Sequence, residues 1–85
     1  MEIIILDSAY KHEISKQSIL SCLLNFQNDL VVTEPPAKRL FVGFDHRGIA
    51  LEIIGIEDEE QDLLIVIHAM KLRKQFYHLL PERGT

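Results

Sequence analysis

Imidazole and cationic side chains gather at two places in this 85-residue chain. Lys11 and His12 precede a segment with helical spacing, whereas His68 ends an apolar run and is followed by Arg73. Such groups suit metal-free cleavage of RNA, in which a 2′-hydroxyl attacks the adjacent phosphate. That step needs a proton acceptor, a proton donor and cations, and histidine serves at either proton step near neutral pH. The candidate catalytic residues are therefore Lys11, His12, His68 and Arg73.

A second set of side chains has the chemistry to hold an RNA substrate. Arginine presents a planar fork to phosphate oxygens, lysine presents a point charge, and tyrosine can stack on a base. The candidate substrate-binding residues are Arg47, Lys71, Lys74 and Tyr77.

Each of these candidates also has a structural interpretation. His68 follows Val66 at strand spacing, so a half-buried ring bonded to a backbone carbonyl is an equal alternative. His46 and Arg47 stand beside Gly48, which is typical of a turn. Likewise, the Lys-His pair at 11–12 can flank a helix, and the tyrosine at 77 can pack on a sheet.

The chain lacks the sequence motifs of several enzyme classes. It contains no P-loop, GxGxxG, HExxH or GxSxG pattern. His12, His46 and His68 have no short-range ligand spacing, so we expect neither a metal site nor a cofactor. The single cysteine, Cys22, cannot form an intramolecular disulfide and is expected in or near the core.

The net charge of −4 argues at first against nucleic-acid binding, which favours a basic surface. The acidity is local, because five acids lie in the segment 57–62, predicted as a solvated hairpin tip. The rest of the chain has eight acids against nine Lys and Arg, including Lys38 and Arg39. A basic patch is therefore compatible with this composition, although an ordinary solvated face is the alternative.

The N-terminal half is predicted to contain a strand and a helix. Glu2–Leu6 is a short, isoleucine-rich strand, and Ser15 is a credible N-cap. Helical spacing then places Ile19, Leu20, Leu23 and Leu24 on one face of a helix that ends near Asn28. The Asn-Asp pair at 28–29 is expected to turn, and the two prolines at 35–36 to form an extended connector.

The C-terminal half is predicted to be a three-stranded meander followed by a helix. The runs 40–44, 49–56 and 63–70 are apolar and separated by short loops, which favours antiparallel hairpins. Helical spacing resumes from Leu72 to Leu80 and stops at Pro81. We therefore expect one α+β domain over residues 1–85, with one or two helices on a curved antiparallel sheet of the N-terminal strand plus the meander.

The N-terminus lacks the cationic start and cleavage site of a signal peptide, and no apolar run approaches a membrane span. Together with the single cysteine, these features lead us to expect a cytoplasmic protein with no membrane partner.

Four segments together resemble the BrnT-type toxins of bacterial toxin–antitoxin pairs. They are YKHEIS at 10–15, LFVG at 40–43, LEII at 51–54 and HAMKLRK at 68–74, and the likeness extends roughly from Ser8 to Leu80. By position, the Lys-His pair at 11–12 and the basic pair at 73–74 match the family's motifs. Lys71 and Leu72 depart from the arginine-proline that many members carry.

The resemblance implies a RelE-like fold, metal-independent RNA cleavage that stops translation, and a small ribbon-helix-helix antitoxin as partner. We therefore expect an endoribonuclease toxin. The alternative is a non-catalytic, toxin-like interaction module that forms homo- or hetero-oligomers, which the net acidity favours. A homodimer through a sheet edge or the terminal helix is expected under either interpretation, because the core is small.

Overall fold

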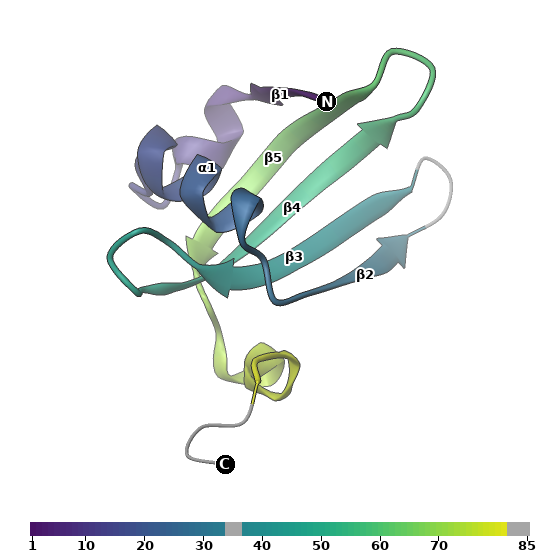
Figure 1. Ribbon diagram of the computed structural model, residues 1–85. Helices are drawn as coiled ribbons and strands as arrows, with labels where there is room; N and C mark the ends of the chain where they lie inside the picture. The colour runs from purple at the N-terminus through teal and green to yellow at the C-terminus, as the bar shows by residue number, and fades with distance from the viewer. Residues whose placement is uncertain (34–36, 82–85) are drawn as a thin grey trace.

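The computed structural model describes residues 1–33 and 37–81, which form a five-stranded sheet and three short helices (Figure 1). The sheet has the order β1-β5-β4-β3-β2. The strands are β1 (Glu2–Ile5), β2 (Asn28–Thr33), β3 (Lys38–Phe44), β4 (Ala50–Asp58) and β5 (Leu63–Lys71). The helices are the α-helix α1 (Lys16–Leu24) and the 3₁₀ helices η1 (Asp7–Tyr10) and η2 (Lys74–Leu79). The prediction of a small α+β domain is confirmed.

The sheet is mixed, so the prediction of a wholly antiparallel sheet was wrong. β2, β3, β4 and β5 pair antiparallel in succession, whereas β1 pairs parallel to β5 through Ile3 with Leu64 and Ile5 with Val66. The chain enters β2 running opposite to β1, and three reversals then bring β5 back in the direction of β1. The direction of the β1 pairing thus depends on β2, a strand that the sequence prediction omitted.

Strand β2 replaces the predicted end of the helix and the predicted turn at 28–29. Helix α1 ends at Leu24, and β2 forms an edge of the sheet against β3. The backbone just before β2 approaches β3 closely, since Gln27 N donates to Val42 O at 2.8 Å. A Cβ atom at Gly43 would lie 2.8 Å from Phe26 Cα, so only glycine permits this crossing. The predicted proline connector at 35–36 lies outside the described residues.

The predicted meander is confirmed as β3, β4 and β5, with slightly longer strands than expected. Glu57 and Asp58 end β4, so the prediction that they belong to the hairpin tip was wrong. Arg39 of β3 forms ion pairs with Asp29 of β2 and with Glu57. These two carboxylates neutralise the charge of Arg39. Arg39 is therefore not available as a free cation for a basic patch in the middle of the chain.

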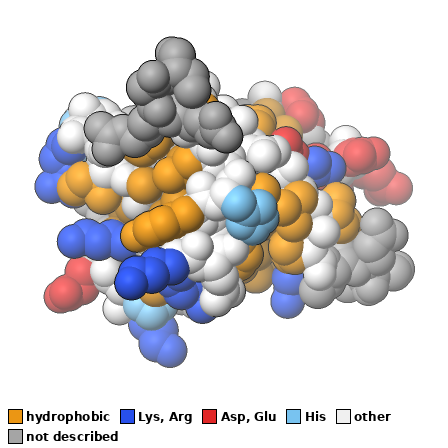
Figure 2. Space-filling view, turned by 90° about the horizontal axis from the view of Figure 1, so that it is seen from below, with side chains coloured by type: hydrophobic (Ala, Val, Ile, Leu, Met, Phe, Trp, Pro, Cys, Tyr) orange, Lys and Arg blue, Asp and Glu red, His pale blue; other side chains and the backbone are white. Residues whose placement is uncertain are grey.

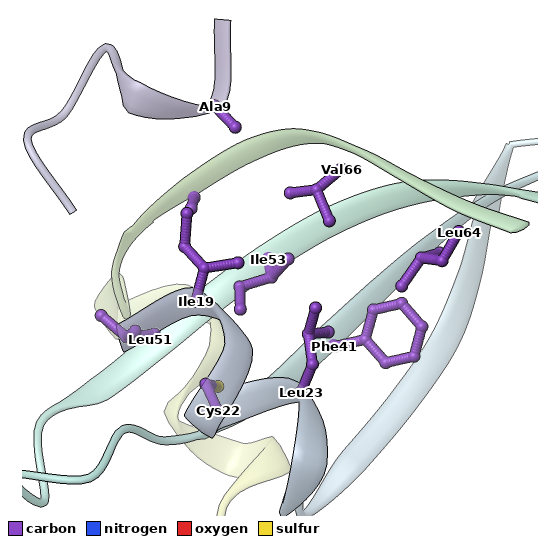
Figure 3. Packing of buried hydrophobic residues seen from close by; sticks show 10 residues of the cluster. Ala9, Ile19, Cys22, Leu23, Phe41, Leu51, Ile53, Leu64 and Val66 are labelled. Atoms are coloured by element: carbon purple, nitrogen blue, oxygen red, sulfur yellow. The ribbon is translucent and has the colours of Figure 1, made fainter. Parts of the chain in front are cut away.

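One face of the sheet carries the main core beneath α1 and η1 (Figures 1 and 3). Ile19, Cys22 and Leu23 of α1 are buried against strand residues that include Ile53 and Val66. The core position predicted for Cys22 is confirmed, and burial raises the pKa of its thiol to about 11. Of the helix face predicted from spacing, Ile19 and Leu23 are buried, whereas Leu24 is 80% exposed. The predicted N-cap is confirmed: the serine hydroxyl at 15 accepts from the backbone N–H of residue 18 at 3.1 Å.

The opposite face of the sheet carries a smaller cluster beneath η2. Leu40 and Val42 of β3 are buried there together with Leu72, and Phe76 packs against them. The predicted helix over 72–80 is a six-residue 3₁₀ helix. Residues on both sides are held extended, because Leu72 N donates to Ala50 O and residue 80 precedes a proline. Within the described ranges no helix is long and apolar enough to cross a membrane.

Candidate functional site

A carboxylate with no exposed surface lies at the centre of the candidate site. Glu52 of β4 accepts hydrogen bonds from three nitrogens of Arg73: the backbone N at 3.0 Å, Nε at 3.1 Å and Nη2 at 2.7 Å. Nε2 of His68 lies 3.2 Å from Oε2 of Glu52. A buried carboxylate is costly unless ionic partners and hydrogen bonds compensate it, and Glu52 has both.

The register of β4 and β5 brings these groups together. Glu52 pairs with Met70, and Ile54 pairs with His68, so Glu52 and His68 are diagonal neighbours on one face of the sheet. Arg73 follows the end of β5 and caps η2 in an extended conformation, from which its backbone and side chain both reach Glu52. This face is the one that η2 covers.

His12 joins the cluster from a distant segment of the sequence. Its ring packs edge-to-face on His68, with centroids 5.6 Å apart and an interplanar angle of 74°. Helix η1 brings it there, because the hydroxyl of Ser8 donates to Ile67 O at 2.9 Å, just beyond the last residue of β5 that pairs with β1. Lys11 lies in the same turn and is exposed.

The turn that carries His12 contains a conformation unusual for its residue. Glu13 has φ 62°, in the left-handed region that favours glycine. Its backbone N–H donates to Tyr10 O at 3.0 Å, so the turn is closed by a hydrogen bond despite this conformation. Residues held in sparsely populated backbone regions are found repeatedly at functional sites, so this turn is a candidate part of one.

The cluster is strongly polarised. Burial acts to raise the pKa of Glu52, but hydrogen bonds from the Arg73 side chain and backbone and from His68 outweigh it and hold the pKa below its ordinary value of 4.5. Glu52 in turn raises the pKa of Arg73. Glu52 is therefore ionised at neutral pH and can only accept, which requires His68 Nε2 to carry a proton. The exchangeable position of the neutral His68 ring is then Nδ1.

Arg73 keeps part of its guanidinium free. Its side chain is 47% exposed, and Nη1 has no hydrogen-bond partner among residues 1–33 and 37–81. The Cζ atom lies 5.5 Å from the centroid of the Phe76 ring, a cation–π distance. Glu52 and Phe76 thus hold Arg73 through Nε, Nη2 and the guanidinium plane, and Nη1 is left available for another acceptor.

The substrate-binding candidates lie outside this cluster. Lys71 and Tyr77 line a groove of about 880 Å³ between η2, the end of β5 and the β3–β4 turn. Lys74 is exposed at the start of η2, directly after Arg73. Arg47 lies in the β3–β4 turn, where its Nη2 is 3.5 Å from Asp45.

The β3–β4 turn has its own buried carboxylate, Asp45. It accepts from the backbone N–H groups of Arg47 and Ile49, each at 2.9 Å, and from the hydroxyl of Ser18 at 2.8 Å. His46 is bonded to Ser21 of α1 through its backbone N–H, at 2.9 Å. These contacts agree with the structural interpretation of His46 as a turn residue.

Glu52 is the member of the cluster that sequence reasoning missed. It is the one acid inside the apolar run 50–56, and an acid at an inward position of a strand requires a cationic partner. The acid in this apolar run could therefore have been recognised as a candidate for a buried ion pair, although the sequence alone does not identify the partner. In the described part of the chain, no three His, Cys, Asp or Glu side chains come together as a metal ion would require.

Among known proteins, no family model, curated protein or solved structure matches this chain. The likeness to BrnT-type toxins therefore rests on the four sequence segments alone. The cluster itself combines two imidazoles in contact, those of His12 and His68, with a buried carboxylate that binds His68 and Arg73.

Proposed function

We propose that this chain is a metal-independent endoribonuclease toxin that inhibits translation by cutting RNA. One observation carries the proposal: His12 packs on His68, and His68 shares the buried Glu52 with Arg73. Cleavage by a neighbouring 2′-hydroxyl needs a base, an acid and a cation, and this cluster supplies one group for each.

The geometry favours a particular division of roles. Glu52 holds the Nε2–H tautomer of His68, which leaves Nδ1 to accept the proton of the 2′-hydroxyl. The 2′-oxygen then bonds to phosphorus while the bond to the 5′-oxygen breaks. His12, in its protonated form, gives a proton to that leaving oxygen. The products are a 2′,3′-cyclic phosphate and a 5′-hydroxyl, so that protons and bonds balance.

Cations near the cluster would stabilise the charge that develops on the phosphate. The Arg73 side chain is 47% exposed, with Nη1 unbonded in the described ranges, and Lys11 is exposed in the turn that carries His12. Lys74 follows Arg73 and can contact a flanking phosphate. Arg47 lies in the β3–β4 turn, outside the cluster, where it would contact a phosphate other than the one that is cut.

The test is cleavage of a defined single-stranded RNA in EDTA by the wild type and by His12→Ala and His68→Ala variants. Each variant should lose at least about 10²-fold in rate, because each removes one proton-transfer group. His78→Ala is the matched control, since His78 is an exposed histidine of η2, and it should cleave like the wild type. Wild-type rates in either cluster variant, at unchanged thermal stability, would overturn the proposal.

The resemblance extends this proposal to a RelE-like fold, action in the cytoplasm and inhibition by a ribbon-helix-helix antitoxin. Such an antitoxin would have to cover the exposed sides of His12 and Arg73. Co-expression with the product of an adjacent gene tests this part: a stable complex in which cleavage is blocked is the expected result. A neighbouring product that neither binds nor inhibits contradicts it.

A second candidate function is a non-catalytic interaction module. It is favoured by the exposed apolar face of α1, where Leu24 is 80% exposed and lines a shallow surface depression with Leu20. The opposed charges of Arg73 and Glu52 also agree with a purely structural ion pair. Absence of cleavage combined with a stable oligomer, measured by light scattering and lost in Leu24→Asp, would favour this candidate.

A further inference from the structure

We infer that the groove lined by Lys71 and Tyr77 binds an unpaired nucleobase of single-stranded RNA, next to the phosphate that is cut. The inference rests on the proposed function and specifies its substrate. The groove is the cavity of about 880 Å³ between η2, the end of β5 and the β3–β4 turn. A cavity of this size can accommodate a small planar ligand.

Two partly exposed aromatic rings line the groove from different elements. Phe44 ends β3 and is 37% exposed, whereas Tyr77 belongs to η2 and is 53% exposed. Large aromatic side chains that remain exposed in a concave apolar site are suited to stacking on a base. This arrangement accepts any base, because every base has a π-face.

The charge near the groove favours a polyanion over an acidic or neutral peptide. Lys71 is exposed and lines the groove, and within the described ranges no acidic side chain lines it. Although the whole chain has a net charge of −4, most Lys and Arg side chains gather toward one end of the face in Figure 2 and most acids toward the other. Hydrophobic side chains lie between them on that face.

The groove adjoins the candidate catalytic cluster. Ala50 lines the groove, and Glu52 lies two residues along the same face of β4, about 7 Å away by strand geometry. Lys71 of the groove ends β5, and one buried residue separates it from Arg73 of the cluster. A base in the groove and a phosphate at Arg73 are therefore close enough to belong to neighbouring nucleotides.

The shape of the groove favours single strands over duplexes. Gly48 lines it with φ +81°, and a Cβ atom there would meet no atom within 4 Å, so the turn leaves the groove open on that side. A base in an A-form duplex is stacked and paired, and it cannot enter such a groove without being extruded.

The test is binding of a fluorescein-labelled, uniformly 2′-O-methylated oligoribonucleotide, measured by anisotropy. This probe has no free 2′-hydroxyl and cannot be cut by the proposed reaction, so binding is measured apart from catalysis. Tyr77→Leu and Phe44→Leu should each raise the Kd about tenfold, as expected for the loss of one stacked base. Tyr77→Phe keeps the ring and should bind like the wild type.

The matched control is Phe26→Leu, which changes an aromatic side chain of similar exposure, 41%, that does not line the groove. It should leave the Kd unchanged. Lys71→Met should weaken binding and reduce the slope of log K against log salt by about one. An unlabelled RNA duplex should compete far less well than an unlabelled single strand.

The outcomes separate this inference from the proposed function. Wild-type binding by Tyr77→Leu and Phe44→Leu, equal competition by duplex, or a probe that does not bind at all overturns the groove as a base site. Cleavage that still depends on His12 and His68 would leave the proposed function standing in those cases. Binding that depends on both rings without any cleavage would uphold the base site and overturn the enzyme.

Discussion

Two buried carboxylates, Asp45 and Glu52, have the same exposure and different surroundings. Each side chain has no accessible surface, and each carboxyl pKa is held below its ordinary value although burial acts to raise it. Asp45 is held mainly by backbone N–H groups and by the hydroxyl of Ser18. Glu52 is held by Arg73 and His68, groups that keep part of their surface exposed.

This difference separates a structural carboxylate from a candidate functional one. The oxygens of Asp45 close the β3–β4 turn and connect it to α1, and their main partners are backbone N–H groups and a buried hydroxyl. The oxygens of Glu52 bind an imidazole and a guanidinium that both keep part of their surface exposed. Burial and a lowered pKa are therefore insufficient to indicate function, and the chemistry of the bonded partners decides.

The largest expected effect is on catalysis in Glu52→Gln. The glutamine amide has the same shape but no negative charge. It therefore neither fixes the Nε2–H tautomer of His68 nor neutralises the charge of Arg73, and RNA cleavage should fall by about 10²- to 10⁴-fold. The pH–rate profile should change shape as well, which a merely destabilised enzyme would not show. The measurement is the cleavage rate at each pH, divided by the folded fraction that the unfolding curve gives. Unchanged cleavage would make Glu52 as structural as Asp45.

Asp45→Ala tests the other side of the comparison. The change leaves the backbone N–H groups of Arg47 and Ile49 and the hydroxyl of Ser18 without their acceptor, at a cost of about 2–3 kcal/mol in the free energy of unfolding. Urea unfolding followed by circular dichroism gives this value. Cleavage per folded molecule should remain that of the wild type. A large loss of cleavage with little loss of stability would reverse the assignment.

The pH dependence of stability should reflect both carboxylates. Since the folded pKa of each lies below its ordinary value, 3.8 for Asp45 and 4.5 for Glu52, each contributes stability that is present at neutral pH. That stability is lost as the pH falls below the ordinary values and through the folded ones. Urea midpoints between pH 6 and pH 2.5 should therefore decline, and Glu52→Gln and Asp45→Asn should each flatten the decline. A variant with the slope of the wild type would show that its carboxylate does not take part.

The regular elements were largely predictable from the sequence, and the contacts between distant segments were not. Strands β3, β4 and β5 follow from long β-branched runs between short loops, and the N-cap of α1 from a serine before a helical pattern. Strand β2 was missed because Asn28 and Asp29 favour turns, and its pairing with β3 is a tertiary effect. His12, His68 and Arg73 were selected by residue type and by their positions along the sequence. Their meeting at Glu52 depends on strand register and on η1, which no local pattern encodes.

The smallest expected effect concerns two turns, the one that contains Asp45 and the one that carries His12. Both contain a residue with positive φ, but the turn at Asp45 uses Gly48, whereas the turn at His12 uses Glu13. Glu13→Gly removes the steric cost of the left-handed conformation and adds the entropy cost of glycine, so the free energy of unfolding should rise by no more than about 1 kcal/mol. The same change should lower cleavage several-fold, because a glycine lets the turn that positions His12 move. Urea unfolding and single-turnover cleavage measure the two effects on one sample. Higher stability with unaltered cleavage would mean that the strained turn does not serve the site.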